Sequence, residues 1–169
     1  RRIASLFGKN HLSSSMRRRE MEMKERAEME ALLRNAPVCR LGLCDGGRPY
    51  VVPVTFVYDG GAVFIHSAPA GEKIRILKEN PRACIEVDSI GKVIPAGEPC
   101  RWTVSYLSVI AQGTAEWIED RGEKAGALAA LVEKYSGQGG VEIPSGGLED
   151  VAVIRIPLTA ITGKLSRGS

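Results

Sequence analysis

The stretch from Val63 to Ile74 holds the side chains with the clearest chemical potential. His66 and Ser67 end an apolar run, and Lys73 follows a short loop that contains Pro69 and Gly71. If Lys73 stands in the first turn of a helix, its ammonium group and the unpaired backbone N–H groups there favour an anion such as a phosphate. The alternative is that Ser67 caps a turn and Lys73 is an ordinary solvent-exposed side chain.

His66 is a candidate acid or base, because imidazole titrates close to neutral pH. Its neighbours Phe64 and Ile65 are apolar, and a histidine at the end of such a strand can equally be a hydrogen-bonded structural residue. Both interpretations stay open at this point.

The elements that must position these residues are mainly strands. Two Asp-Gly-Gly segments, at 45–47 and 59–61, separate β-branched runs and predict consecutive hairpins in an antiparallel meander. Gly113 is a candidate site for a β-bulge. We expect strands at 38–44, 50–58, 62–67, 82–88, 102–117 (one bent strand or a pair) and 151–156 (with a continuation through 158–162), helices at 21–35, 72–80 and 121–135, and loops at 89–100 and 136–147. Six or seven short strands with helices at the margins predict a small barrel that closes the sheet.

The composition fits one soluble domain. The chain has 169 residues, a mass of 18.2 kDa and a formal net charge of +3, which is too mild to predict a nucleic-acid partner. Its four cysteines match no zinc or redox spacing, and with two histidines no metal site is expected. No segment resembles a signal peptide or a membrane span, so we expect a cytoplasmic protein. We expect residues 1–15 to be a leader or a foreign segment without order, followed by a domain at 16–164 and a tail at 165–169.

Several sequence blocks, taken in order, carry a resemblance to a known family. They are Ala36–Leu41, Pro49–Phe56, Phe64–Ala68, Gly71–Ile74, Ser108–Ile110 and Gly113–Glu116. Together they resemble the Nim-type nitroimidazole-reductase-related flavoproteins of the pyridoxamine-phosphate-oxidase-like group. The resemblance implies a mainly β fold with flanking helices, an antiparallel split β-barrel of the FMN-binding type. It also implies a homodimer with FMN at the interface between the subunits.

The resemblance also implies roles for particular residues. Ser108 would belong to the side of the site that faces the subunit interface. The remaining cofactor-binding residues would be Pro53, Val54, Thr55 and Phe56 along the isoalloxazine ring or ribityl chain, His66 and Ser67 at polar edges or the phosphate, and Lys73 at the phosphate. We expect His66 to be the catalytic residue, through stabilisation of reduced-flavin charge or proton transfer. Leu107 departs from the family pattern, where a basic residue often stands, and one phosphate or substrate contact is then lost.

From these expectations we predict that the protein is an FMN-dependent oxidoreductase that reduces small electrophiles such as nitro-aromatic compounds. NAD(P)H would react transiently over the flavin, since the chain has no G-x-G-x-x-G segment after a strand. Two alternatives stay open. One is a split-barrel binding module for haem, a deazaflavin or a flavin without turnover, and the other is a family member that binds no cofactor.

Overall fold

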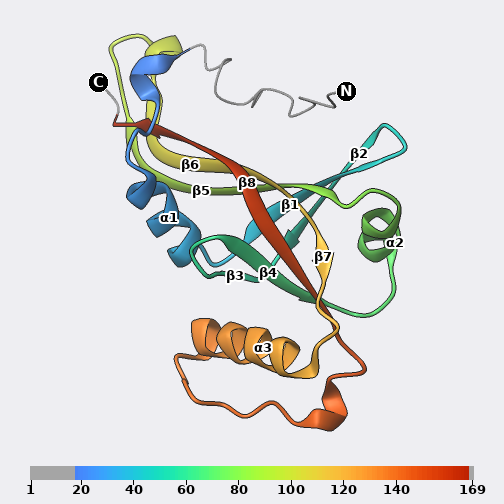
Figure 1. The fold of residues 1–169 in the computed structure, drawn as a ribbon. Helices are drawn as coiled ribbons and strands as arrows, with labels where there is room; N and C mark the ends of the chain where they lie inside the picture. Colours follow the sequence, from blue (N-terminus) through green and yellow to red (C-terminus); the bar gives the residue numbers. More distant parts are fainter. Residues whose placement is uncertain (1–17, 168–169) are drawn as a thin grey trace, which may run out of the picture.

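The computed structural model describes residues 18–167, and in this range eight strands form one antiparallel sheet (Figure 1). The strands are β1 (Cys39–Asp45), β2 (Arg48–Val54), β3 (Phe56–Tyr58), β4 (Ala62–Ser67), β5 (Arg82–Ile94), β6 (Thr103–Thr114), β7 (Glu116–Trp117) and β8 (Ala152–Ser166). The helices are α1 (Arg26–Asn35), α2 (Glu72–Glu79) and α3 (Arg121–Ser136), with 3₁₀ turns at Arg19–Met21, Pro99–Arg101 and Ser145–Gly147. The expectation for residues 1–15 falls outside the described range, and β8 includes the first two residues of the expected tail.

The sheet follows the order β2-β1-β5-β6-β8-β4-β3, and β7 pairs with β8. Within residues 18–167, β2 and β3 therefore lie at the two ends of the order and do not pair with each other. Thr55 alone separates them in the chain, so one bent stretch of chain joins the two ends of the order.

Both predicted Asp-Gly-Gly turns are confirmed. In the β1–β2 hairpin, Gly46 and Gly47 have φ values of 56° and 94°, as a two-residue turn of type I′ requires. In the β3–β4 hairpin, the Asp59 carboxylate accepts hydrogen bonds from the backbone N–H groups of Gly61 and Ala62 at 2.8 and 2.7 Å. The expected strand at 50–58 pairs with both of its neighbours in the chain, with β1 through β2 and with β4 through β3, and is interrupted only at Thr55.

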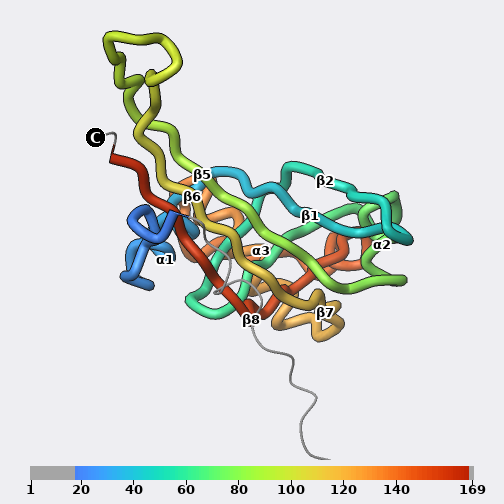
Figure 2. The backbone as a smooth tube through the Cα atoms, turned by 90° about the horizontal axis from the view of Figure 1, so that it is seen from above, coloured from blue at the N-terminus to red at the C-terminus, as the bar shows by residue number. Residues whose placement is uncertain are grey.

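The β5–β6 hairpin is longer than the sequence predicts. The expected loop at 89–100 is strand as far as Ile94, which pairs with Thr103 beyond a register shift between Ile90 and Val93. The Ser105 hydroxyl accepts the N–H of Lys92 at 2.8 Å and satisfies the backbone at this irregularity. Figure 2 shows the hairpin projecting well beyond the rest of the sheet.

The long strands β6 and β8 pair with each other and join the two halves of the sheet. The predicted bulge at Gly113 is confirmed, because the β6–β8 register shifts between Gln112 and Gly113. A Cβ atom at Gly113 would lie 2.3 Å from the carbonyl oxygen of Pro157, so only glycine permits the approach. The strand expected at 151–156 continues through Pro157 to Ser166.

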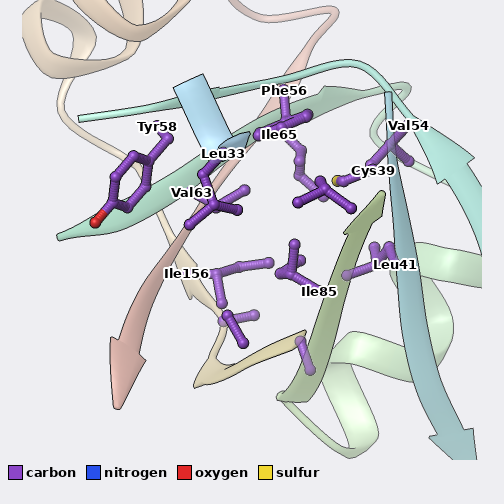
Figure 3. Close-up of a cluster of buried hydrophobic side chains, with 14 of the residues drawn as sticks. Leu33, Cys39, Leu41, Val54, Phe56, Tyr58, Val63, Ile65, Ile85 and Ile156 are labelled. Atoms are coloured by element: carbon purple, nitrogen blue, oxygen red, sulfur yellow. The ribbon is translucent and has the colours of Figure 1, made fainter. Parts of the chain in front are cut away.

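The hydrophobic core lies on the concave side of the sheet. Leu33 of α1, Leu41 of β1 and Ile85 of β5 are fully buried and point into one cluster (Figure 3). Helix α1 covers this cluster and begins at Arg26, five residues later than predicted. Along β1 the residues alternate, so that Cys39, Leu41 and Leu43 are buried while Arg40 is exposed.

The opposite side of strands β2, β1, β5 and β6 and the C-terminal part of β8 is called here the outer face. Strand alternation and register place on it Arg40, Val51, Glu86, Asp88, Ile90, Val93, Ser108, Ile110 and Lys164. Val51, Ile90, Val93 and Ile110 are exposed by 64, 70, 61 and 40%. The outer face thus exposes large apolar side chains over several neighbouring strands.

Candidate functional site

The break between β2 and β3 brings Thr55 next to His66. The last pair of the β3–β4 ladder is Phe56 with Ile65. Thr55 precedes Phe56 and His66 follows Ile65, so the two side chains lie side by side at the end of this ladder. Both are exposed, and they form the polar start of a site that two separate stretches of the sequence contribute.

The structure shows how the side chain of His66 is oriented. Its neighbour Ile65 is fully buried, whereas His66 points to the other side and is exposed. Within residues 18–167 its side chain has no hydrogen-bond partner and no carboxylate nearby. His66 is therefore not a buried structural residue, and its imidazole is free to meet a ligand.

The four predicted cofactor contacts from Pro53 to Phe56 separate into two pairs. Pro53 and Thr55 are exposed, while Val54 and Phe56 point into the core with exposures of 7 and 0%. The period of two along a strand explains this split. Only Pro53 and Thr55 can offer side chains to a cofactor here, and Val54 and Phe56 can offer only backbone groups.

Tyr135 fixes the break at Thr55 from the far end of α3. Its hydroxyl accepts the N–H of Phe56 at 2.9 Å and lies 2.8 Å from the carbonyl oxygen of Pro37, to which it donates. Because β3 begins at Phe56, this bond satisfies a backbone donor that no strand partner reaches. From the sequence, Tyr135 had no role beyond its place at the end of the helix expected at 121–135, so this positioning role was missed.

Lys73 stands in the first turn of α2, as predicted. The N-cap residue is Gly71, with a φ of 122° and no side chain to bond the free backbone N–H groups of the helix start. Lys73 is half-buried, and burial lowers the pKa of its amino group. Within residues 18–167 it makes no ion pair, so the helix start carries a positive charge without a counter-ion.

The acidic residues near Lys73 have another partner. Arg75 lies 2.7 Å from the Glu72 carboxylate and 2.8 Å from that of Asp45, which ties α2 to β1. Hydrogen bonds from Arg75 and then Arg48 lower the pKa of Asp45 to about 2. These charges neutralise one another and leave Lys73 as the cation available to an anionic ligand.

Ser67 is half-buried at the end of β4, directly before the loop to α2. Together with Thr55, His66 and Lys73 it belongs to segments that follow one another closely in the chain or pair in the sheet. These residues form the candidate site within one chain.

Ser108 lies far from His66 within one chain. It lies on the outer face, where it pairs with Asp88 on one side and Lys164 on the other. His66 pairs with Val153, and Val153 and Lys164 are eleven positions apart on β8. At roughly 3.3 Å per residue, this separation is about 36 Å along the strand. A flavin at His66 therefore does not reach Lys164 along β8, whereas Pro53, which pairs with Arg40, shares the outer face with Ser108.

Leu107 points to the opposite side from Ser108. It pairs with Leu165, and both side chains pack against the core. The position at which the family pattern often has a basic residue thus serves packing in this chain.

The described part of the chain offers few other chemical groupings. No group of three or more histidine, cysteine or acidic residues within 18–167 is arranged to hold a metal ion. The four cysteines are free, and burial raises the pKa of the Cys39 thiol to about 12. No helix in this range is both long and apolar enough to cross a membrane.

Three solved structures resemble this fold. A protein of Bacteroides thetaiotaomicron VPI-5482, described as a candidate 5-nitroimidazole antibiotic resistance protein, is 29% identical, with 86% of each chain covered and a TM-score of 0.78. The flavocytochrome Anf3 of Azotobacter vinelandii is 22% identical over 91% of this chain and 73% of that one, with a TM-score of 0.79. An FAD- and haem-binding protein of Mycobacterium smegmatis is 22% identical over 88% and 74%, with a TM-score of 0.78.

Sequence comparison gives a consistent result. An uncharacterized protein of Rhizobium meliloti (strain 1021) is 27% identical over 67 residues, which are 40% of this chain and 44% of that relative's length. The profile of the pyridoxamine 5'-phosphate oxidase family matches residues 25–165. Because this match spans most of the chain and the solved relatives share the split sheet, the chain belongs to the pyridoxamine 5'-phosphate oxidase family and has its antiparallel split-barrel fold.

Proposed function

We propose that this protein binds FMN at the site of Thr55, His66, Ser67 and Lys73 and uses it to reduce small electrophiles such as nitro-aromatic compounds. The observation that carries the proposal is Lys73, an unneutralised ammonium group in the uncapped first turn of α2. This arrangement suits a phosphate, which accepts charge-assisted hydrogen bonds from lysine and from free backbone N–H groups. The Bacteroides relative, at 29% identity, supports the class of acceptor.

The residues of the site divide the work of binding and proton transfer. Lys73 and the N–H groups of the α2 start would hold the phosphate, and Pro53 and Thr55 would line the cofactor. When bound, FMN supplies electron transfer from a donor such as NAD(P)H to the acceptor. His66 would hold a proton on its imidazole and give it to the reduced acceptor, because its side chain is exposed and has no protein partner in residues 18–167.

We further propose a homodimer in which a second copy packs on the outer face. Two observations support it. The outer face exposes the apolar side chains of Val51, Ile90, Val93 and Ile110, which a partner subunit would cover. Ser108, which the family resemblance assigns to the cofactor site, lies on this face and far from Lys73 along the chain's own sheet. Light scattering of the purified protein tests the dimer, and a monomer that holds one flavin per chain would refute it.

The first experiment identifies the chromophore that copurifies with the protein. We expect the purified protein to show flavin absorption bands and to release FMN on denaturation, identified by chromatography against FMN, FAD and riboflavin. A Soret band would instead indicate haem. Protein that carries no chromophore and does not bind added FMN would overturn the proposal.

The role of His66 is tested with His66→Ala, and with Ser136→Ala as a control at an exposed residue on α3. The histidine variant should keep its fold and most of its FMN affinity, because Lys73 still holds the phosphate. Reduction of a nitro-aromatic acceptor, followed by stopped-flow under anaerobic conditions, should slow by roughly 100-fold or more. Flavin reoxidation at the wild-type rate would remove His66 from the reaction.

A further inference from the structure

Three residues form a row across the outer face. Asp88 of β5 pairs with Ser108 of β6, and Ser108 pairs with Lys164 of β8. Side chains at paired positions point to the same side of a sheet and lie next to one another. Ser108 therefore has a carboxylate on one side and an ammonium group on the other.

The charges at the two ends of this row differ in their partners. Asp88 accepts a hydrogen bond from Arg40, whose guanidinium also lies 3.4 Å from the Glu86 carboxylate. On its other side Lys164 pairs with Glu22 in an isolated β-bridge, but no carboxylate lies within ion-pair distance of its amino group in residues 18–167. Its amino group lies 5.7 Å from the centre of the Tyr106 ring, which holds the half-buried side chain on the outer face. In this row, the ammonium group of Lys164 is therefore the one available to bind an anion or a hydrogen-bond acceptor from outside the chain.

Lys164 cannot serve the candidate site of its own chain. The C-terminal end of β8 and helix α2, which carries Lys73, lie on opposite sides of the molecule in both views (Figures 1 and 2). The separation of about 36 Å along β8 between Lys164 and the strand neighbour of His66 agrees with this placement. A flavin that touches both lysines must lie between two subunits.

Strand β6 itself offers no cation at this point. Leu107, beside Ser108, points to the core, so the cation next to Ser108 on the outer face comes from the neighbouring strand β8. Lys164 is directly across from Ser108 and is that cation.

We propose that Lys164 of one subunit completes the cofactor site of its partner, where its ammonium group donates a hydrogen bond to the phosphate or to an acceptor atom of the flavin ring beside Ser108. The inference rests on the proposed function, because it assumes that a flavin occupies the site around Lys73 and that the outer face is the dimer interface. It adds a second cation that the sequence blocks did not single out.

The first test is flavin titration of Lys164→Met. We expect the dissociation constant for FMN to rise roughly tenfold or more, the loss expected for a charge-assisted hydrogen bond. Lys164→Arg, which keeps the charge, should restore most of the affinity. Lys24→Met removes an exposed lysine that makes no ion pair in residues 18–167 and should bind FMN like the wild type. Titrations use protein concentrations at which light scattering shows each variant to be a dimer.

Riboflavin, which lacks the phosphate, distinguishes a contact with the phosphate from a contact with the isoalloxazine ring. If Lys164 binds the phosphate, Lys164→Met should change the affinity for FMN and leave that for riboflavin unchanged. If it binds the ring, both affinities should fall. An unchanged affinity for both flavins would overturn the inference.

The decisive test is a mixed dimer of Lys73→Met and Lys164→Met chains, isolated with two different affinity tags. If the two lysines meet across the interface, one site of the mixed dimer carries both changes and the other carries neither. The mixed dimer should then bind one FMN with wild-type affinity, while each homodimeric variant binds two weakly. Two equally weak sites in the mixed dimer would refute the inference and leave the proposed function intact. A wild-type protein that binds no flavin would overturn both.

Discussion

Replacing Lys73 by methionine separates a ligand-binding role from a structural one. Lys73 has no ion pair to lose within residues 18–167, and burial already disfavours its charged form. A methionine of similar length keeps the apolar contacts of the side chain. We therefore expect the stability of the cofactor-free protein to stay the same or to rise slightly in Lys73→Met.

Flavin affinity should respond in the opposite direction. A hydrogen bond to a charged group contributes about 1.5–3 kcal/mol, so the dissociation constant for FMN should rise about 10- to 150-fold. Fluorescence titration reports the affinity, and thermal unfolding of the same samples without FMN reports stability. Lys78→Met changes an exposed lysine in the last turn of the same helix and should leave FMN binding unchanged.

The pH dependence gives an independent check on Lys73. Its pKa in the free protein lies below the ordinary value of 10.5, and a bound phosphate favours the protonated form. Wild-type affinity should therefore be lost as the pH rises through this lowered pKa, whereas affinity in Lys73→Met should vary less over the same range. Unchanged FMN affinity in Lys73→Met, with or without this pH dependence, would place the phosphate elsewhere.

Three further substitutions test the scaffold. Tyr135→Phe removes the hydroxyl that accepts the Phe56 N–H and should lower the free energy of unfolding by about 1 kcal/mol in urea denaturation; no loss would mean that water replaces the bond. Lys134 has a buried amino group without a hydrogen-bond partner and a pKa lowered by burial. The wild type should therefore gain stability relative to Lys134→Met as the pH rises toward 10.5, and a constant difference would contradict this. Gly113→Ala should lower stability by about 1–3 kcal/mol because of its clash with a backbone oxygen, whereas Gly126→Ala, in open space on α3, should not.

The sequence predicted the parts of the fold that depend on local chemistry. The Asp-Gly-Gly turns follow from the need for positive φ at Gly46 and Gly47. The start of α2 beside Lys73 follows from the loop before it. The ends of strands are less local, because Ile90 to Ile94 become strand only through their partners on β6. The residue pattern within one strand does not show which residues of another strand it will pair with.

The candidate site shows the same division. The exposure of His66 and the inward direction of Val54 and Phe56 follow from the strand period of two, once the strands are known. The support that Tyr135 gives to Phe56 joins residues 79 positions apart, and no local pattern predicts such a contact. The resemblance grouped Ser108 with Lys73 but could not say whether one chain brings them together.

The separation of these residues predicts that flavin binding and dimerisation are linked. If each site needs residues of both subunits, FMN binds the dimer and not the monomer, so FMN must favour dimerisation by the same free energy by which dimerisation favours FMN. The apparent affinity for FMN should therefore fall when the protein is diluted below the dimer dissociation constant, and added FMN should shift that constant to lower concentrations in sedimentation experiments. Ile110→Arg, which introduces a charge at an exposed apolar position of the outer face, should weaken dimer and flavin binding together, although residue 110 lies far from Lys73. An FMN affinity that stays constant while the dimer dissociates would show that one chain holds the whole site, and the assignment of Ser108 to it would then be wrong.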